Sequence, residues 1–348
     1  MWQVWSEIHA LMTQGAYDEA LAEIAIHRDE CRGTFSPLFV LEAACVARHG
    51  QPENYARAAE ILQEATGFDD RNYWVYYNLA HFLGKLGRTR EALLAIWRAH
   101  AIHGWSESGE KGYEFTHDYF SPNIPRWTKW FADLITMRPI YCLEVGSWQG
   151  ASATWLLDKV VSARGGLLSC IDTFAGSSEH EALLGSLGSS LEAIFDSNIA
   201  KTGYRAMCRK LVGSSQERLR PLPPEAFDFI YIDGAHEAKF VIQDAVLALP
   251  LLKPGGYILF DDVPFRFAHN PRQDTARAVE FFADVFHDEL ICISQRISDA
   301  VAEGALTPPR GSRRYRFDTE TEQMRKLEVE VESFRNGLRV ALKLHSKD

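Results

Sequence analysis

The sequence lacks the features that mark nucleic-acid-binding, membrane-spanning and secreted proteins. Acidic residues outnumber basic ones, and a net charge of -10 leaves no basic stripe for binding nucleic acid. No uncharged apolar run reaches the roughly 18 residues that a membrane span requires. The first residues, MWQVWSEIHALM, have no basic segment and are interrupted by Glu7 and His9, which argues against a signal peptide. We therefore expect a soluble, cytoplasmic protein that binds neither nucleic acid nor a membrane.

Cysteine is scarce, and no two cysteines form the CxxC pair that is typical of a zinc or redox site. Several of them lie inside apolar stretches. The cysteines are Cys31, Cys45, Cys142, Cys170, Cys208 and Cys292. Their scattered positions predict buried thiols in a reducing compartment, rather than zinc ligands or a disulfide framework.

The length of 348 residues is typical of two domains. Residues 1–105 are predicted to be helical throughout. The segments GAYDEALAEIAIH and GRTREALLAIWRAHAIHG repeat one pattern, at an offset that corresponds to two repeats of about 34 residues. The positions that fit this pattern best are Leu79, Ala80, Leu83, Ala92, Ile96 and Ala99. The region resembles two and a half to three degenerate tetratricopeptide (TPR) repeats, which implies a docking surface for a protein partner, a self-association contact, or a helical array packed on the next domain.

Residues 106–318 are predicted to form an α/β domain. An aromatic segment, residues 107–129, opens it and forms either a pocket wall or a packed linker. Seven short apolar runs then alternate with helical segments and turns, which is typical of a doubly wound, mostly parallel sheet with an antiparallel hairpin at its edge. The expected strands are residues 140–146, 167–174, 209–213, 227–233, 256–262, 289–297 and 312–317.

The last segment, residues 319–348, is predicted to form an amphipathic helix. Its apolar residues recur at alternating spacings of four and three residues, which places them on one helix face. They are Leu327, Val331, Phe334, Leu338 and Ala341. We expect this helix to pack on its own domain, and a dimer contact is the alternative.

Chemically useful side chains are concentrated in residues 227–263. This stretch is predicted to be a strand–helix–strand unit of a parallel sheet, and such sheets bind ligands beyond the carboxyl ends of their strands. One strand ends in Asp233, with His236 three residues later, and the next strand ends in Asp261 and Asp262. Three carboxylates offer oxygen ligands to Mg²⁺, and an imidazole beside them is suited to act as a general base.

A second group of polar residues follows the first two strands of this domain. Glu144 precedes Gly146 and Gly150 at a strand-to-helix turn, where glycines let backbone amides approach a ligand closely. Asp172 ends the next strand, at the position that binds ribose hydroxyls in nucleotide-binding folds. An acid for an ammonium group, amides for a carboxylate and an acid for a ribose fit S-adenosylmethionine better than NAD.

Over residues 118–317 the sequence resembles the class I S-adenosylmethionine-dependent O-methyltransferases. Motifs similar to those of the catechol O-methyltransferase-like group are LEVGSWQGAS, VGSSQERLRPL, IYIDGAH and ILFDDV. Motifs similar to those of bacterial methyltransferases that act on sugar hydroxyls are IDTFAG, IDGAH and KPGG. The catechol enzymes have Lys where this chain has His236 and Asn where it has Asp262, which favours the sugar-type group.

The resemblance implies a role for each matching residue. The implied cofactor-binding residues are Glu144, Gly146, Gly150 and Ser152 for the methionine part, Asp172 for the ribose, and Ser215 and Gln216 for the adenine. The implied Mg²⁺ ligands are Asp233, Asp261 and Asp262, and the implied catalytic base is His236.

We therefore expect a Mg²⁺-dependent O-methyltransferase that acts on a hydroxyl of a sugar, a glycan or another natural product. Three alternatives stay open: a methyltransferase for an aromatic diol or an amine, a hydroxylase on the same scaffold, and a TPR scaffold with an inactive methyltransferase domain. The expected pocket walls, residues 107–129, 174–200 and 263–273, do not specify the acceptor.

Overall fold

The computed structural model describes residues 1–134, 138–176, 190–263, 265–267, 269–292 and 340–344. The chain divides into two compact units, Met1–Trp130 and Phe131–Asp348, whereas the sequence places a domain boundary at residue 105. Among the described residues, no helix combines the length and the apolar character that crossing a membrane requires. As the sequence predicts, the cysteines whose side chains are described are buried free thiols: Cys31, Cys45, Cys142, Cys170 and Cys208.

The first unit is built from helices, and from α1 to α7 each helix packs against the next along the chain. They are α1 (Trp2–Thr13), α2 (Tyr17–Cys31), α3 (Pro37–Val46), α4 (Pro52–Thr66), α5 (Tyr73–Lys85), α6 (Thr89–Ile102), α7 (Glu107–Glu110) and the start of α8 (Ile124–Leu134). The prediction of a helical N-terminal region is confirmed. All six positions that fit the TPR pattern are buried, as any packed helical array requires, so the TPR assignment stays a prediction.

The segment after α6 belongs to the first unit because its aromatic side chains form a buried cluster. Trp105 has no solvent exposure. Its ring centroid lies 5.8 Å from that of Tyr113, 6.3 Å from that of Phe115 and 6.0 Å from that of Phe120. Burial of several large rings stabilises this segment strongly, which moves the boundary of the unit towards residue 130.

The second unit is an α/β structure whose described strands form one sheet in the order β3-β2-β1-β4-β5-β7-β6. The strands are β1 (Ile140–Val145), β2 (Gly166–Asp172), β3 (Cys208–Val212), β4 (Phe227–Ile232), β5 (Leu252–Phe260), β6 (Leu290–Cys292) and β7 (Val340–Leu344). Strands β1 to β5 run parallel, and β7 is antiparallel to both β5 and β6. The predicted α/β fold with a parallel sheet is confirmed.

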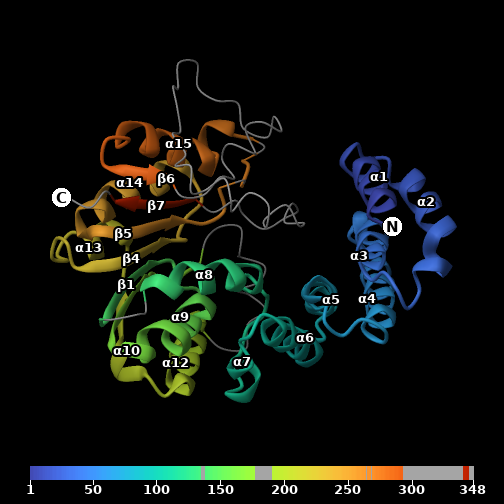
Figure 1. The fold of residues 1–348 in the computed structure, drawn as a ribbon, viewed down its shortest axis with the longest axis horizontal. Helices are drawn as coiled ribbons and strands as arrows, with labels where there is room; N and C mark the ends of the chain where they lie inside the picture. The colour runs from blue at the N-terminus through green and yellow to red at the C-terminus, as the bar shows by residue number, and fades with distance from the viewer. Residues whose placement is uncertain (135–137, 177–189, 264, 268, 293–339, 345–348) are drawn as a thin grey trace. The chain divides into compact units, whose positions relative to one another are not determined.

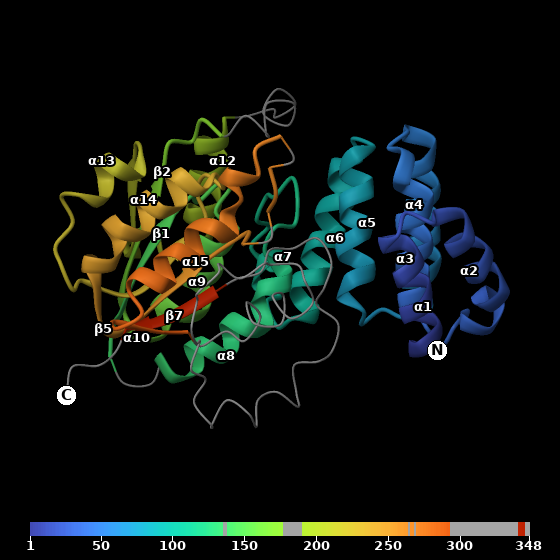
Figure 2. The same ribbon diagram turned by 90° about the horizontal axis from the view of Figure 1, so that it is seen from above.

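Helices cover both faces of this sheet, as Figures 1 and 2 show for α14 and α15 on one face and α9 and α12 on the other. Besides the end of α8, the α-helices described in this unit are α9 (Ala151–Leu156), α10 (Ser162–Arg164), α12 (Leu191–Thr202), α13 (Ser215–Leu219), α14 (Ala238–Ala248) and α15 (Thr275–Val285). Beneath α14 and α15, apolar strand residues such as Ile230 and Phe260 form one buried core with Val241 and Phe282. This core fixes the ends of β4 and β5, which carry the candidate site.

The end of the chain differs from the prediction. The sequence predicts a helix over residues 319–348, whereas residues 340–344 form strand β7. Val340 pairs with Phe260 of β5, and Lys343 pairs with Ile291 of β6. The edge of β5 presents a row of backbone groups that need partners, and this long-range pairing outweighs the local helical pattern. The remainder of the expected helix and the expected strand at 312–317 lie outside the described residues.

Candidate active site

The carboxyl ends of four neighbouring parallel strands meet at one edge of the sheet. In space these strands are ordered β2, β1, β4 and β5. Val145 pairs with Ile171 on one side and with Ile232 on the other, so the ends of β2, β1 and β4 are level. The structure thus gathers at one edge the polar residues that the sequence places at the strand ends.

The turn between β1 and α9 depends on glycine. Gly146 has a φ of 86° and Gly150 a φ of 83°, both in the left-handed region that glycine tolerates best. A Cβ on Gly146 would lie 1.9 Å from the carbonyl oxygen of Asp233, whereas a Cβ on Gly150 would lie 3.0 Å from the ring of Phe195. The absence of a side chain at Gly146 therefore brings the turn after β1 against the end of β4.

Asp172 holds this turn in place. Its Oδ2 accepts hydrogen bonds from the backbone N–H groups of Ser147, at 2.7 Å, and Trp148, at 2.8 Å. Its Oδ1 accepts one from the N–H of Phe174 at 2.7 Å. Trp148 has a left-handed φ of 47°, so the turn is strained as well as tight. Asp172 thus has a structural role that the sequence motif does not indicate.

Glu144 is a buried carboxylate at the end of β1, with no solvent exposure. Ser147 Oγ donates a hydrogen bond to it at 2.6 Å, and Ser152 Oγ donates another at 2.5 Å. Burial raises the pKa of Glu144 to about 7, and the hydrogen bonds from Ser147 and Ser152 oppose that rise. A cation placed beside this carboxylate would favour its charged form.

Ser215 and Gln216 open α13, close to the end of β3, and both lie next to Asp244 of α14. Ser215 Oγ donates to Asp244 Oδ1 at 2.6 Å, and Gln216 Nε2 lies 3.5 Å from the same oxygen. Burial raises the pKa of Asp244 to about 6. Asp244 is missing from the residues that the motifs indicate, although a single acid within the apolar helix AKFVIQDAVLA is a signal for it.

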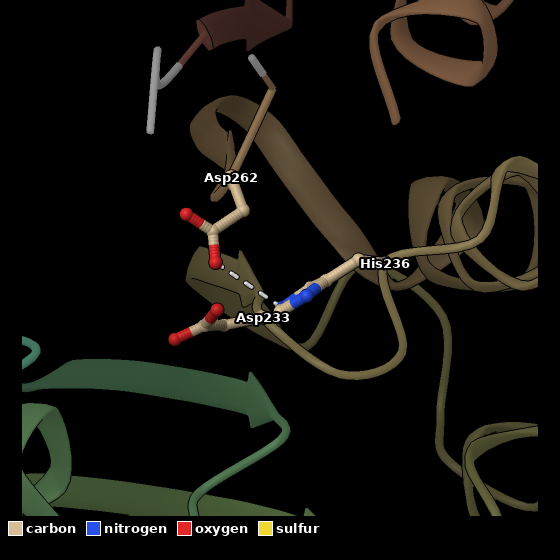
Figure 3. Close-up of side chains that lie close together, drawn as sticks. All are labelled: Asp233, His236 and Asp262. Carbon is tan, nitrogen blue, oxygen red and sulfur yellow. Dashed lines mark ion pairs between the residues drawn. The ribbon is translucent and has the colours of Figure 1, made fainter. Parts of the chain in front are cut away.

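Asp233, His236 and Asp262 converge beyond the ends of β4 and β5, as Figure 3 shows. One donor atom of each residue lies within 4.8 Å of the donor atoms of the other two. His236 Nε2 is 3.2 Å from Asp262 Oδ2. All three residues are half-buried, so their donor atoms can reach a ligand from solvent.

The imidazole of His236 is held by its neighbours. Its ring centroid lies 5.0 Å from that of Phe265, which follows Asp262 by three residues. Thr275 Oγ1, at the start of α15, donates a hydrogen bond to the carbonyl oxygen of His236 at 2.7 Å. The contact with Phe265 was not indicated by the sequence motifs.

Asp261 is outside this group, although the sequence places it among the metal ligands. Its side chain is buried and accepts hydrogen bonds from the hydroxyl of Tyr231 and from the backbone N–H of Asp262. Strand β5 ends at Phe260, and the left-handed φ of 48° at Asp262 turns the two adjacent acids in different directions.

Residues 143–263 match a protein family described as a methyltransferase domain. The second unit contains a methyltransferase domain. The match begins within β1 and ends just after β5, and it includes every cofactor-binding and metal-binding candidate named from the sequence, but not Phe265 or Thr275. The resemblance to methyltransferases that the sequence motifs indicate is confirmed.

Solved structures similar to this chain include several methyltransferases. TomG, an O-methyltransferase of tomaymycin synthesis from Streptomyces achromogenes, is 16% identical, with 73% of this chain and 89% of TomG covered, at a TM-score of 0.43. An O-methyltransferase from Bacillus cereus is 18% identical, with coverages of 64% and 91% and a TM-score of 0.38. Phosphoethanolamine N-methyltransferase 2 from Haemonchus contortus is 14% identical, with coverages of 73% and 60% and a TM-score of 0.37. No curated protein matches the chain in sequence.

The donor set of the methyltransferase domain fits a divalent cation. The carboxylates of Asp233 and Asp262 offer the oxygen ligands that Mg²⁺ or Mn²⁺ prefers. His236 Nε2, 3.2 Å from Asp262 Oδ2, would lie directly beside an ion held by these carboxylates.

Proposed function

We propose that this protein is an S-adenosylmethionine-dependent methyltransferase that methylates a hydroxyl group, with the help of a divalent cation. The observation that carries the proposal is the meeting of two groups at one sheet edge. The buried Glu144 and the glycine turn lie at the end of β1, and the group of Asp233, His236 and Asp262 lies at the ends of β4 and β5. The contact between Gly146 and the backbone of Asp233 joins the two groups directly.

The first group has the chemistry that S-adenosylmethionine requires. Glu144 would pair with the ammonium group of the cofactor, and the backbone amides around Gly146 and Gly150 would approach its carboxylate. Ser152 would support Glu144 through its hydrogen bond. Asp172 retains free lone pairs for the ribose hydroxyls, since each carboxylate oxygen accepts more than one hydrogen bond.

The adenine end of the cofactor would lie at the start of α13. Ser215 and Gln216 are oriented there by Asp244. Their backbone and side-chain groups are the expected adenine contacts, as the family resemblance implies. Asp244 would fix the positions of both residues.

The second group would receive the acceptor. When bound, S-adenosylmethionine supplies a methyl group on a positively charged sulfur, and Mg²⁺ lowers the pKa of a hydroxyl held next to it. Asp233 and Asp262 would hold the ion. His236 would accept the proton of the acceptor hydroxyl, whose oxygen would then be the nucleophile for the methyl group that the cofactor would supply. Alignment of the two substrates accounts for most of the acceleration.

A sugar, a glycan or a similar polyol is the acceptor class that these residues favour. An imidazole at His236 and a carboxylate at Asp262 differ from the Lys and Asn that the catechol-type enzymes carry at these positions. Two neighbouring hydroxyls of a polyol can bind the same ion. One of them would be methylated, and the other would hold it in the right orientation. Aromatic diols and amines are the competing acceptors in a substrate screen.

The test is calorimetric titration of the chelator-treated full chain with S-adenosylhomocysteine, with and without Mg²⁺. We expect Asp172→Asn to weaken S-adenosylhomocysteine binding and to leave Mg²⁺ binding unchanged. Asp233→Asn should weaken Mg²⁺ binding and leave S-adenosylhomocysteine binding unchanged. Asp284→Asn, an exposed acid on α15, serves as the control and should change neither. If the wild-type chain bound neither ligand, the enzyme proposal would be wrong, and the helical unit would be the place to look for function.

A further inference from the structure

The loop that follows β5 carries two phenylalanines beside the candidate base. Phe265 and Phe267 are both half-buried. The ring centroid of Phe265 lies 5.0 Å from that of His236 and 5.0 Å from that of Phe267. The ring planes are inclined by 48° and 58°, in the tilted arrangements that aromatic pairs adopt readily. The three rings thus form a row that begins at the imidazole.

Hydrogen bonds within the loop fix the backbone of both phenylalanines. The N–H of Phe265 donates to the carbonyl oxygen of Asp262 at 2.8 Å. The N–H of Phe267 donates to Asp274 Oδ1 at 2.8 Å, and its carbonyl oxygen accepts the N–H of Asn270 at 2.8 Å. A surface that is ordered before a ligand arrives loses less conformational entropy on binding, so these rings are suited to receive one.

The far end of the same loop is tied to the turn that carries His236. Gln273 Oε1 accepts a hydrogen bond from the N–H of Lys239 at 3.1 Å. Thr275 Oγ1 donates to the carbonyl oxygen of His236 at 2.7 Å. The loop after β5 and the turn after β4 are therefore connected at both ends of the loop, which holds Phe265 beside the base.

This row of rings adds an apolar surface to a group of polar side chains. Small-molecule sites are lined largely by apolar and aromatic residues, with a few polar groups that fix the orientation of the ligand. A pyranose ring has a matching character, because its hydroxyls lie around the edge and its C–H bonds lie on the faces. The face of an aromatic ring is partly negative and attracts such C–H hydrogens. An open-chain polyol has similar hydroxyls but no flat C–H face.

We propose that Phe265 is a specificity-determining residue for the acceptor: its ring receives the C–H face of a pyranose, so that a hydroxyl of the sugar reaches His236. Phe267 holds the ring of Phe265 in place. This inference rests on the proposed methyltransferase function, and it narrows the acceptor class from polyols in general to cyclic sugars. It does not depend on which carboxylates bind the cation.

The test compares cyclic acceptors with open-chain acceptors of the same configuration. The cyclic probes are the methyl pyranosides of glucose, galactose, mannose and rhamnose, the open-chain probes are the four corresponding alditols, and catechol is the aromatic probe. The formation of S-adenosylhomocysteine from S-adenosylmethionine gives kcat and KM for each probe. The variants of the full chain are Phe265→Ala, Phe265→Tyr and Phe267→Ala. Calorimetric titration with S-adenosylhomocysteine shows whether each variant keeps its cofactor site.

We expect the wild-type KM of the best pyranoside to be at least about tenfold lower than that of its alditol. Phe265→Ala should raise the KM of the pyranoside by about tenfold, the size of effect expected for the loss of one aromatic contact. It should leave the KM of the alditol nearly unchanged, so that the two acceptors become similar. Phe265→Tyr keeps the ring and should stay within about threefold of the wild type, and Phe267→Ala should have a smaller effect than Phe265→Ala.

Phe281→Ala is the matched control for the loss of a phenylalanine. Phe281 is 60% exposed on α15 and belongs to neither candidate group of the site. It should change neither the KM of any acceptor nor the affinity for S-adenosylhomocysteine. All three site variants should likewise bind S-adenosylhomocysteine as the wild type does.

Equal wild-type KM values for pyranosides and alditols would overturn the inference. So would a Phe265→Ala variant whose kcat falls equally for both kinds of acceptor at unchanged KM, because Phe265 would then only orient His236. Methylation of catechol alone would show that the ring facing Phe265 is aromatic and not a sugar. If the wild-type chain binds S-adenosylhomocysteine but methylates no pyranoside, this inference is wrong and the cofactor proposal stands. If it does not bind S-adenosylhomocysteine, the proposed function fails as well.

Discussion

At the scale of single residues, the proposed pairing of the buried Glu144 carboxylate with the ammonium group of the cofactor predicts that cofactor binding depends on pH. Its pKa of about 7 means that at pH 6 only about a tenth of the unliganded protein carries the charge that an ammonium group needs. We therefore predict that S-adenosylhomocysteine binds about tenfold more weakly at pH 6 than at pH 8. Calorimetric titration at pH 6, 7 and 8 measures this change.

The Glu144→Gln variant distinguishes a pH dependence caused by Glu144 from one caused by other groups that titrate in the same pH range. The variant keeps an oxygen for the hydroxyls of Ser147 and Ser152 but carries no charge, so its affinity should be low and the same at all three pH values. Equal wild-type affinities at pH 6 and pH 8 would show that Glu144 does not bind the ammonium group.

The sequence predicts where a candidate site residue lies when that residue stands at the end of a recognisable strand. Asp172 and Asp233 follow apolar runs that can only be buried strands, so their gathering at one sheet edge follows from parallel topology. The separation of Asp261 from Asp262 was not predictable, because it depends on the hydroxyl of Tyr231 and on one backbone conformation. Asp244 was missed for a similar reason, since its partners belong to another helix.

At the scale of elements, the turn between β1 and α9 requires glycine at position 146. We predict that Gly146→Ala lowers the free energy of unfolding by about 3 kcal/mol or more, by adding an overpacking penalty to the cost of a left-handed alanine. It should also abolish S-adenosylhomocysteine binding, because the turn and the backbone of Asp233 must move apart. Urea unfolding and calorimetry measure the two effects.

Gly203→Ala is the control for this turn. Gly203 also has a left-handed φ, of 79°, but a Cβ there would meet nothing within 4 Å. It should cost only the roughly 1–2 kcal/mol of the backbone conformation and should leave ligand binding intact. Equal effects of the two substitutions would mean that the close approach to Asp233 is unimportant.

Strand β7 is an element that the local sequence pattern does not predict, because it forms through long-range pairing. The sequence predicted a strand within or overlapping each of β1 to β5, although β5 begins at Leu252, four residues before the predicted start. Residues 340–344 fit a helical pattern and become a strand through pairing with β5 and β6. Such pairing joins residues far apart in the chain. It therefore depends on the finished sheet and not on local propensity.

We predict that a chain ending at residue 339 loses stability, because it exposes one edge of β5 and leaves β6 without its neighbour. At about 1 kcal/mol for each lost ladder hydrogen bond, the unfolding midpoint of the second unit should fall by at least about 5 °C. A chain ending at residue 344 keeps β7 and should unfold like the full protein. If the two truncated chains were equally stable, β7 would not be part of the sheet.

At the scale of the whole molecule, the two units differ in how folding changes their proton affinity. In the first unit, burial lowers the pKa of His103 to about 4 and also lowers that of His9. The unfolded chain then binds more protons than the folded unit at mildly acidic pH. In the second unit, burial raises the pKa of Glu144 to about 7 and that of Asp244 to about 6, so the folded unit binds more protons there.

Stability rises with pH wherever the unfolded state binds more protons than the folded state. Stability falls with rising pH wherever the folded state binds more protons. Between pH 6.5 and pH 5 the first unit should therefore lose about 2 kcal/mol, and the second should gain a similar amount. Calorimetric melting of the full chain should show two transitions that move in opposite directions, with S-adenosylhomocysteine raising only the second. His103→Gln should remove most of the pH response of the first transition, and Glu144→Gln should weaken that of the second. Two transitions that shift in the same direction on acidification would contradict these assignments.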